Sequence, residues 1–185
     1  MRVSREQAAS NRERILETAA RLFRENGFNG VGLDAIMKAA GLTHGGFYGH
    51  FKSKDDLVAE AVIRALEASA DRMSAHETLQ KYAQAYLSER HCADRGNGCV
   101  LAALGADMAR RAGGVRRSLT AYLGIRIDRL ASLIKLGPRA RRRQRAIATL
   151  AGLVGALTLA RAVDDPALSR EILAAARAVY GADEV

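Results

Sequence analysis

Tryptophan is absent from this 185-residue sequence, and only two prolines and two cysteines occur in it. The scarcity of proline leaves long stretches without an obligatory helix break. Cys92 and Cys99 are too few for a disulfide framework, which favours a reduced, cytoplasmic protein. Clusters of strand-forming residues are scarce as well, whereas alanine and leucine dominate. The sequence therefore predicts a globular, all-α protein.

Long apolar runs and catalytic motifs are also missing. The longest apolar run, Ala146–Ala160, is shorter than the roughly 20 residues of a membrane span, and the polar start Met1–Ser10 does not resemble a secretory signal. We find no paired carboxylates, nucleophile motif or phosphate-binding loop, and His91, Cys92 and Cys99 match no common zinc spacing. We therefore expect no enzyme activity, no cofactor, no metal site and no membrane association.

The sequence has a formal net charge of +9, which indicates attraction to a polyanion such as nucleic acid. The charge does not locate the contact. Residues 1–54 carry 9 Lys/Arg against 5 Asp/Glu, a net +4, whereas residues 76–185 carry 18 against 10, a net +8. Five of the arginines lie in the run Arg139–Arg145, which suggests either a second anionic contact or, more simply, a solvated helix start.

Apolar residues recur at helical spacing along the first 75 residues. This pattern predicts four helices, over residues 5–26, 33–40, 44–50 and about 54–74. Gly41 separates the second helix from the third, and Thr43 is a good N-cap for the third. Ser53 and Asp56 form an acidic version of a capping box for the fourth helix. The two short helices joined by a short turn at Gly41 are typical of a helix-turn-helix.

The stretch of residues 41–57, GLTHGGFYGHFKSKDDL, contains four glycines beside several aromatic residues. A recognition helix enters the major groove with its N-terminal end nearest the bases, and Gly45 and Gly46 would let the backbone approach closely. Thr43 would hold a phosphate at the helix N-terminus, and Tyr48 and Lys54 would contact others. The alternative interpretation is a flexible glycine-rich loop between packed helices.

These segments resemble the tetracycline-repressor (TetR) family of bacterial regulators. The resemblance is carried by RILETAARLFRENGF, by AIMKAAGLTHGGFYGHFKSKDDL and by the core Tyr48, His50, Phe51, Ser53 and Lys54. It implies an N-terminal three-helix DNA-binding domain over residues 1–53, with the helix-turn-helix at about 33–52, and a C-terminal helical domain over residues 54–185. It also implies a cytoplasmic homodimer, nucleoid-associated when bound to double-stranded operator DNA, which a small-molecule effector releases.

Carried over to this sequence, the resemblance assigns Thr43, Tyr48 and Lys54 to DNA phosphates and places His44, Gly45 and Gly46 nearest the base edges. His50 is ambiguous between a phosphate contact and packing. The family usually has a hydroxyl-bearing pair before the second helix, but this sequence has Val31 and Gly32 there. Glycine is a tolerable N-cap, although one hydroxyl contact is lost. An N-terminal arm with Arg2 and Arg5 could add contacts or be a solvated tail.

In the C-terminal half, the pattern predicts further helices over residues 77–90, 99–111, 115–136, 139–163 and 166–181, about nine in the whole chain. The last two helices are rich in alanine, glycine and leucine, and they either form a dimer interface or are simply buried in their own subunit. The residues expected in the interface are Ala148, Ala151, Gly152, Gly155, Leu159, Leu168 and Ile172. A second set could line the effector pocket or be plain core: Met73, Tyr82, Tyr86, Cys99, Leu104, Met108 and Tyr122.

Two alternatives to an effector-released repressor remain open at the level of sequence. The +9 charge also suits a nonspecific architectural DNA-binding protein. Cys99 follows Gly96-Asn97-Gly98 and could begin a helix, where a thiol is activated, with Cys92 as its resolving partner. The second alternative is thus a repressor that senses oxidants or electrophiles, and the simpler interpretation of Cys99 is a packed core residue.

Overall fold

The computed structural model describes residues 4–74, 77–111, 113–135 and 137–181, without the side chains of residues 70–74. This part of the chain is helical and contains no strand. Its elements are α1 (Arg5–Asn26), α2 (Leu33–Ala39), the 3-10 helix η1 (His44–Gly49), α3 (Lys54–Ser74), α4 (Leu79–Tyr86), α5 (Glu89–Ala93), α6 (Val100–Ala109), α7 (Gly114–Leu133), α8 (Arg139–Ala162) and α9 (Pro166–Tyr180). The predicted all-α class is confirmed.

Local side-chain chemistry sets most helix boundaries. The Ser4 hydroxyl accepts a hydrogen bond from the Gln7 amide at the start of α1, and Gly27, with φ +75°, ends that helix. Asp165 caps α9 in the same way, with Pro166 in the first turn as expected. Because these signals are local, they could be predicted from sequence.

The prediction of a single helix over residues 77–90 is wrong, since this segment contains α4 and the start of α5. Leu87 ends α4, and the Ser88 hydroxyl accepts a hydrogen bond from the His91 amide to start α5. Ser88 can act as a cap because serine competes with the helical backbone for its hydrogen bonds. This break turns the segment after α4 toward the loop that precedes α6.

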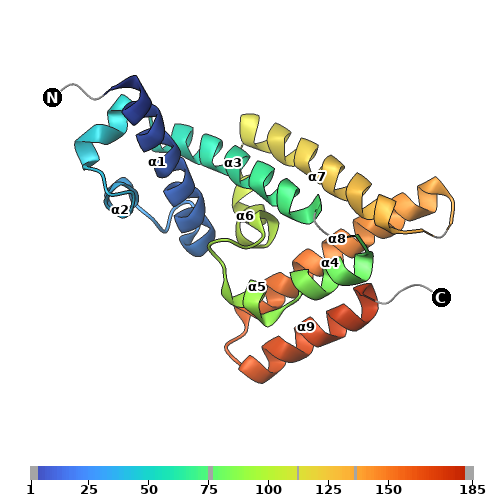
Figure 1. The fold of residues 1–185 in the computed structure, drawn as a ribbon. Coiled ribbons are helices and arrows are strands. Elements are labelled where there is room, and N and C mark those ends of the chain that lie inside the picture. The colour runs from blue at the N-terminus through green and yellow to red at the C-terminus, as the bar shows by residue number, and fades with distance from the viewer. Residues whose placement is uncertain (1–3, 75–76, 112, 136, 182–185) are drawn as a thin grey trace.

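The helices enclose two apolar cores. The first joins the N-terminal helices to the front half of α3, to α6 and to the first half of α7. The second lies among α4, the second half of α7, α8 and α9. As Figure 1 shows, α1, α2 and η1 occupy one end of the molecule, whereas α8 and α9 lie at the other. The first core therefore connects the N-terminal end directly to α6 and α7.

Helix α8 has one unusual property. It is long and apolar enough to cross a membrane by length and composition, yet 33% of its apolar window is buried inside the protomer. It packs against α5, α6, α7 and α9. The remaining apolar surface of α8 lies uncovered in the single chain.

Candidate DNA-binding interface

A tight turn joins α2 to η1. Gly41 has φ +68°, and the amides of Gly41 and Leu42 donate to the carbonyls of Lys38 and Met37 at 3.0 and 2.9 Å. A side chain at Gly41 would be strained by this left-handed conformation. Met37 and Phe47 are fully buried on either side of the turn. The turn and its apolar support thus fix η1 against α2, as in a helix-turn-helix.

The predicted third helix is present, but as a 3-10 helix over His44–Gly49. Three of its six residues are glycine, and each glycine disfavours an α-helix interior by about 1 kcal/mol relative to alanine. The tighter 3-10 form suits such short segments. Phe47 and Phe51 stack below η1 with ring centroids 5.7 Å apart, so the segment has a rigid base despite its glycines.

The upper side of η1 faces solvent. Thr43, His44, Gly45 and Gly46 are exposed, and 65% of Tyr48 is accessible. A Cβ added at Gly45 would meet no atom within 4 Å, and one at Gly46 would make only ordinary contacts at 3.8 Å. The protein's own side chains therefore leave the tip of η1 open. Neither glycine is required for packing inside the protomer.

The hydroxyl of Thr43 is not used for capping, although Thr43 occupies the N-cap position of η1 as expected. Tyr48 leans edge-on against Phe47, with ring centroids 5.2 Å apart, and its position leaves the ring exposed. Lys54 begins α3 and is half-buried, and His50 is half-buried beside Phe51. These side chains surround the open tip.

An acidic neighbour of His44 was missed from the sequence. Asp34, in the first turn of α2, lies 2.5 Å from the imidazole Nδ1 of His44. This contact gives the ring an orientation and places a carboxylate near the exposed tip. Lys52, exposed between η1 and α3, was also overlooked; its position between two residues of the DNA-contact motif was the available signal. Of the N-terminal arm, Arg5 starts α1 and Arg2 lies outside the described residues.

The helix after η1 is capped by both partners expected from sequence. The Ser53 hydroxyl accepts from the Asp56 amide at 3.1 Å, and the Asp56 carboxylate accepts from the Lys52 amide at 3.2 Å. Asp55 forms an ion pair with Arg111, just after α6, at 2.5 Å. The start of α3 is thereby held to the C-terminal part of the molecule.

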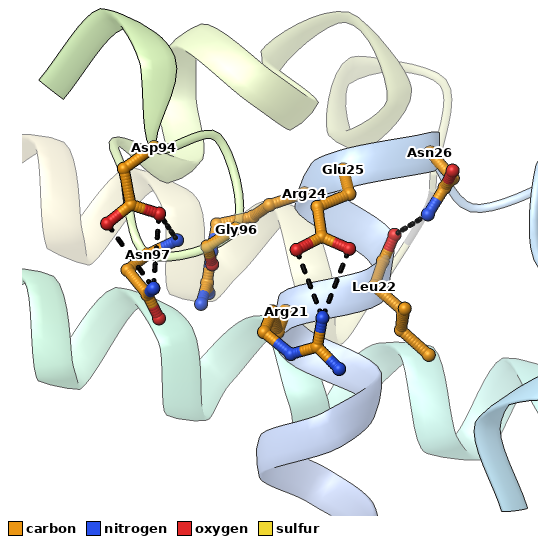
Figure 2. A network of polar contacts seen from close by, with 8 residues as sticks. All are labelled: Arg21, Leu22, Arg24, Glu25, Asn26, Asp94, Gly96 and Asn97. Atoms are coloured by element: carbon orange, nitrogen blue, oxygen red, sulfur yellow. Dashed lines mark hydrogen bonds and ion pairs between the residues drawn. The ribbon is translucent and has the colours of Figure 1, made fainter. Parts of the chain in front are cut away.

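A second connection between the two ends of the molecule involves α1. Figure 2 shows Arg24 of α1 donating to the carbonyl of Gly96, in the loop before α6. Asp94 fixes that loop by accepting hydrogen bonds from the Asn97 amide and side chain. Gly96 is needed here, since a Cβ would press against Arg21 and Glu25. A displacement of the loop before α6 would therefore strain or break its hydrogen bond to Arg24 of α1.

The residues expected to line an effector pocket divide between the two cores. Leu104, Met108 and Tyr122 belong to the first core, and Tyr82, Tyr86 and Cys99 to the second. All six are buried, whereas the side chain of Met73 lies outside the described residues. The structure joins the two groups through Arg126, which is 3% exposed and contacts both Tyr82 and Tyr122. Arg126 was not singled out from sequence.

The residues expected in a dimer interface lie on α8 and α9. Leu159 and Leu168 are among the exposed large apolar residues, at 59% and 41%, and Ala148 and Ala151 of α8 are also exposed. Gly155 and Ile172 are partly exposed. Gly152 has another role: a Cβ there would clash with the Tyr180 ring of the same chain. The small size of Gly152 thus serves packing of α9 on α8.

The all-helical fold and the tight turn between α2 and η1 define this chain as a helical protein with an N-terminal helix-turn-helix. Residues 15–61 match the family described as bacterial regulatory proteins, tetR family. Over 59 residues the chain is 44% identical to the HTH-type transcriptional regulator AcrR of Shigella flexneri, covering 32% of this chain and 27% of AcrR. It is 39% identical over 87 residues to the HTH-type transcriptional regulator LmrA of Bacillus subtilis, covering 44% and 46%. The matched segments span less than half of either relative.

Similarity of fold extends over the whole chain. A TetR transcriptional regulator from Chloroflexus aurantiacus has a TM-score of 0.78 at 22% identity, with coverage of 95% of this chain and 94% of that one. FadR from Bacillus subtilis, solved in complex with stearoyl-CoA, has a TM-score of 0.56 at 20% identity, with coverage of 92% and 99%. The sequence resemblance to the TetR family is thus confirmed over residues 15–61, and the chain as a whole shares the fold of the regulators compared.

Proposed function

We propose that this protein is a sequence-specific DNA-binding transcriptional regulator, and that a small molecule bound by its C-terminal helices releases it from a palindromic operator. The observation that carries the proposal is the exposed, side-chain-poor tip of η1 on a fully buried apolar base. Such a tip can approach duplex DNA closely without deforming. The matched relatives are transcriptional regulators, and one fold neighbour holds a small molecule, which supports both parts.

In this proposal, Thr43, Tyr48 and Lys54 contact DNA phosphates, with His50 as a further candidate. They position the protein without reading sequence. His44, Gly45 and Gly46 lie against the base edges, and the contact of His44 with Asp34 fixes its ring. The tip offers few side chains for base readout, so DNA shape contributes to specificity.

We further propose that the exposed apolar face of α8 and α9 pairs with a second copy of the chain. Leu159 on α8 and Leu168 on α9 are the exposed leucines of this face, and Ala148 and Ala151 are exposed on α8 as well. Pairing would cover the part of α8 that stays uncovered in one protomer. A dimer also presents two η1 tips, as two half-sites about 34–36 Å apart require.

Release would follow from the two connections between the ends of the molecule. The pair Arg111–Asp55 holds the start of α3, and the contact of Arg24 with Gly96 holds α1 to the loop before α6. An effector that moved α6 or α7 would shift both. It would change DNA affinity only by the difference in its own affinity for the two conformations. In this scheme residues 1–53 read DNA and residues 54–185 respond and dimerise.

The two alternatives gain no support from the structure. Cys99 is 4% exposed at the start of α6, where its thiol makes no capping hydrogen bond, and Cys92 is only partly exposed. A sensing thiol needs access to its oxidant. The other alternative, nonspecific DNA binding, was suggested by the positive charge. The arginines at the start of α8 lie at the end of the molecule remote from η1 in Figure 1, and one of them, Arg143, already pairs with Asp128 at 2.5 Å. They therefore do not extend the surface formed by η1.

The proposed function is tested by selecting DNA fragments with the purified protein from a random pool and sequencing them. A specific regulator enriches one palindromic site and retains it at about 150 mM salt against excess random DNA. Enrichment of no site, or loss of the preference under competition, would leave a nonspecific binder and reject the proposal.

Removing a phosphate contact should weaken binding to every DNA sequence by a similar factor. Tyr48→Phe and Lys54→Ala test this, because phosphates carry no base code. Lys54→Ala should also lower the slope of log K against log salt by about 1. Fluorescence anisotropy with the selected site and with a scrambled duplex measures both effects. A change in preference between the two duplexes would show that the residue reads bases instead.

Two glycines of α8 should respond differently to alanine. Gly152→Ala forces a Cβ into the Tyr180 ring and should lower the free energy of unfolding by about 1–3 kcal/mol, as overpacking does. Gly155→Ala meets nothing within 4 Å in the protomer, so it should leave protomer folding intact and weaken only dimerisation. Urea unfolding at several protein concentrations separates the two effects. Equal responses would contradict this assignment.

A further inference from the structure

Among the residues whose side chains the structure describes, the C-terminal helices bury one charged side chain, and no acidic side chain pairs with it. Arg126 of α7 is the only charged residue among the buried ones that the structure describes. Its guanidinium donates to the hydroxyl oxygens of Tyr122, at 3.1 Å, and Tyr82. It also lies 5.5 Å from the centre of each of these rings. Removing a cation from water is unfavourable, and neutral hydroxyls compensate this cost only in part.

Two buried donors of this cluster are unused. The Nε of Arg126 and the hydroxyl of Tyr86 make no hydrogen bond of ordinary geometry, although the Cys99 thiol lies near enough to the Tyr86 hydroxyl to help raise its pKa. Tyr86 packs on Tyr82, with ring centroids 5.7 Å apart, so it belongs to the same cluster. Buried polar atoms are nearly always satisfied. Burial raises the pKa of the Tyr86 hydroxyl, which therefore keeps its proton and can donate.

The chemistry of these donors specifies what would complete the site. Nε of arginine can only donate, and together with a terminal N–H it forms the fork that binds a carboxylate through two parallel hydrogen bonds. Only two of the five guanidinium N–H groups are used by the hydroxyls. With a single cation in the cluster, a group of one negative charge is neutralised, whereas a doubly charged phosphate would not be.

An apolar hollow lies beside the cluster. It has a volume of about 360 Å³ and is lined mainly by apolar residues of α3 and α7, with Tyr122 on its wall: Ile63, Leu66, Glu67, Ser118, Ala121, Tyr122 and Ile125. The same Tyr122 holds Arg126 and donates to Ser69 of α3 at 2.9 Å. A molecule in the hollow can thus reach Arg126 by displacing one side chain.

We propose that Arg126 and Tyr86 bind the carboxylate of a small organic acid whose apolar part occupies the hollow beside Tyr122. Binding of the acid stands on its own, whereas its role as the effector rests on the proposed function. The acid would reach Arg126 by displacing the Tyr122 side chain, which would then give up its hydrogen bonds with Arg126 and Ser69. Helix α3, which begins at Lys54 beside the DNA-contacting tip, would then lose its buried polar link to α7.

The test compares hexanoate and benzoate with their uncharged amides, hexanamide and benzamide, at millimolar concentration and constant ionic strength, without DNA. The acids should raise the Tm of the wild-type protein through binding to the folded state, and the amides should not. Isothermal titration should show at least about tenfold weaker acid binding to Arg126→Gln, as loss of a charge-assisted hydrogen bond predicts. Equal responses to acids and amides, or no response to either, would overturn the proposal.

Tyr86→Phe provides a second test of the site, one that does not depend on the folding of Arg126→Gln. It removes a hydroxyl that makes no hydrogen bond of ordinary geometry, so it should leave the Tm unchanged or higher while weakening acid binding several-fold. Tyr180→Phe, outside the cluster, is the matched control and should bind the acids as the wild type does. If Tyr86→Phe kept full acid affinity, the proposed site would be wrong.

DNA binding is measured separately. Acids that bind through Arg126 and Tyr86 and lower affinity for the selected DNA site support the whole scheme. Acids that bind in this way without changing DNA affinity support the site and reject its role as an effector site. Failure to select any DNA site while acid binding persists would reject the proposed function and leave the acid site standing.

Discussion

Gly45→Leu is expected to lower affinity for the selected DNA site by about a thousandfold or more, down to the level of nonspecific binding. Nothing in the protomer lies within 4 Å of an added Cβ at Gly45, so a leucine would project from the open tip. It would hold the backbone of η1 away from the base edges and pull the neighbouring phosphate contacts out of reach. Anisotropy titration with the selected duplex measures the loss.

The fold should tolerate the same substitution. Leucine has a higher helix propensity than glycine, so the Tm and the dimeric state should be unchanged or slightly improved. Gly114→Leu is the matched control, because Gly114 is exposed at the start of α7 and also has open space around its Cβ. It should bind DNA as the wild type does. Normal binding by Gly45→Leu would refute the idea that the glycines admit DNA.

The turn and capping features of the N-terminal domain could be predicted because they are local. Gly41 and Ser53 act within a few residues of their own positions, and the positive φ that favours glycine leaves a direct trace in the sequence. The amphipathic spacing of α1 likewise reports its buried face. The order of the helices in this region and the turn at Gly41 therefore follow from local sequence signals.

Contacts between distant residues could not be predicted in this way. Arg126 and Tyr122 lie four residues apart on α7 and therefore share a face, but only tertiary packing places Tyr82 of α4 beside Arg126. Gly152 resembles the other small residues of α8, yet it is matched to Tyr180 of its own chain. The contact of His44 with Asp34 crosses the turn between two helices. In each case, sequence spacing does not specify the partner.

The 3-10 form of η1 is an intermediate case. The glycines that weaken an α-helix are visible in the sequence, but their spacing still allows one. Side-chain packing then holds this short segment in place. Phe47 is fully buried and stacked on Phe51, so one side of η1 is fixed and the other side stays open. The glycines are then free for contact with another molecule.

Leu159→Glu is expected to have the second large effect, because it would separate the dimer and remove DNA binding with it. Leu159 is 59% exposed in the protomer, so a glutamate there is solvated in the single chain and the fold should survive. In the paired state the symmetric interface would bury the carboxylate twice without partners. Several kcal/mol of lost association corresponds to an increase of about a hundredfold or more in the dimer Kd.

Analytical ultracentrifugation and DNA titration measure the two consequences. A protomer holding one half-site loses half of its specific contacts, so affinity for the palindrome should fall toward the nonspecific level. Ile125→Glu is the control, since Ile125 has the same 59% exposure but lies on α7 and not on α8 or α9. Because Ile125 also lines the hollow beside Tyr122, both variants are compared without added acid. It should remain dimeric and bind DNA. If Leu159→Glu stayed dimeric, the partner subunit would have to dock elsewhere, and the spacing of the two η1 tips would need a different explanation.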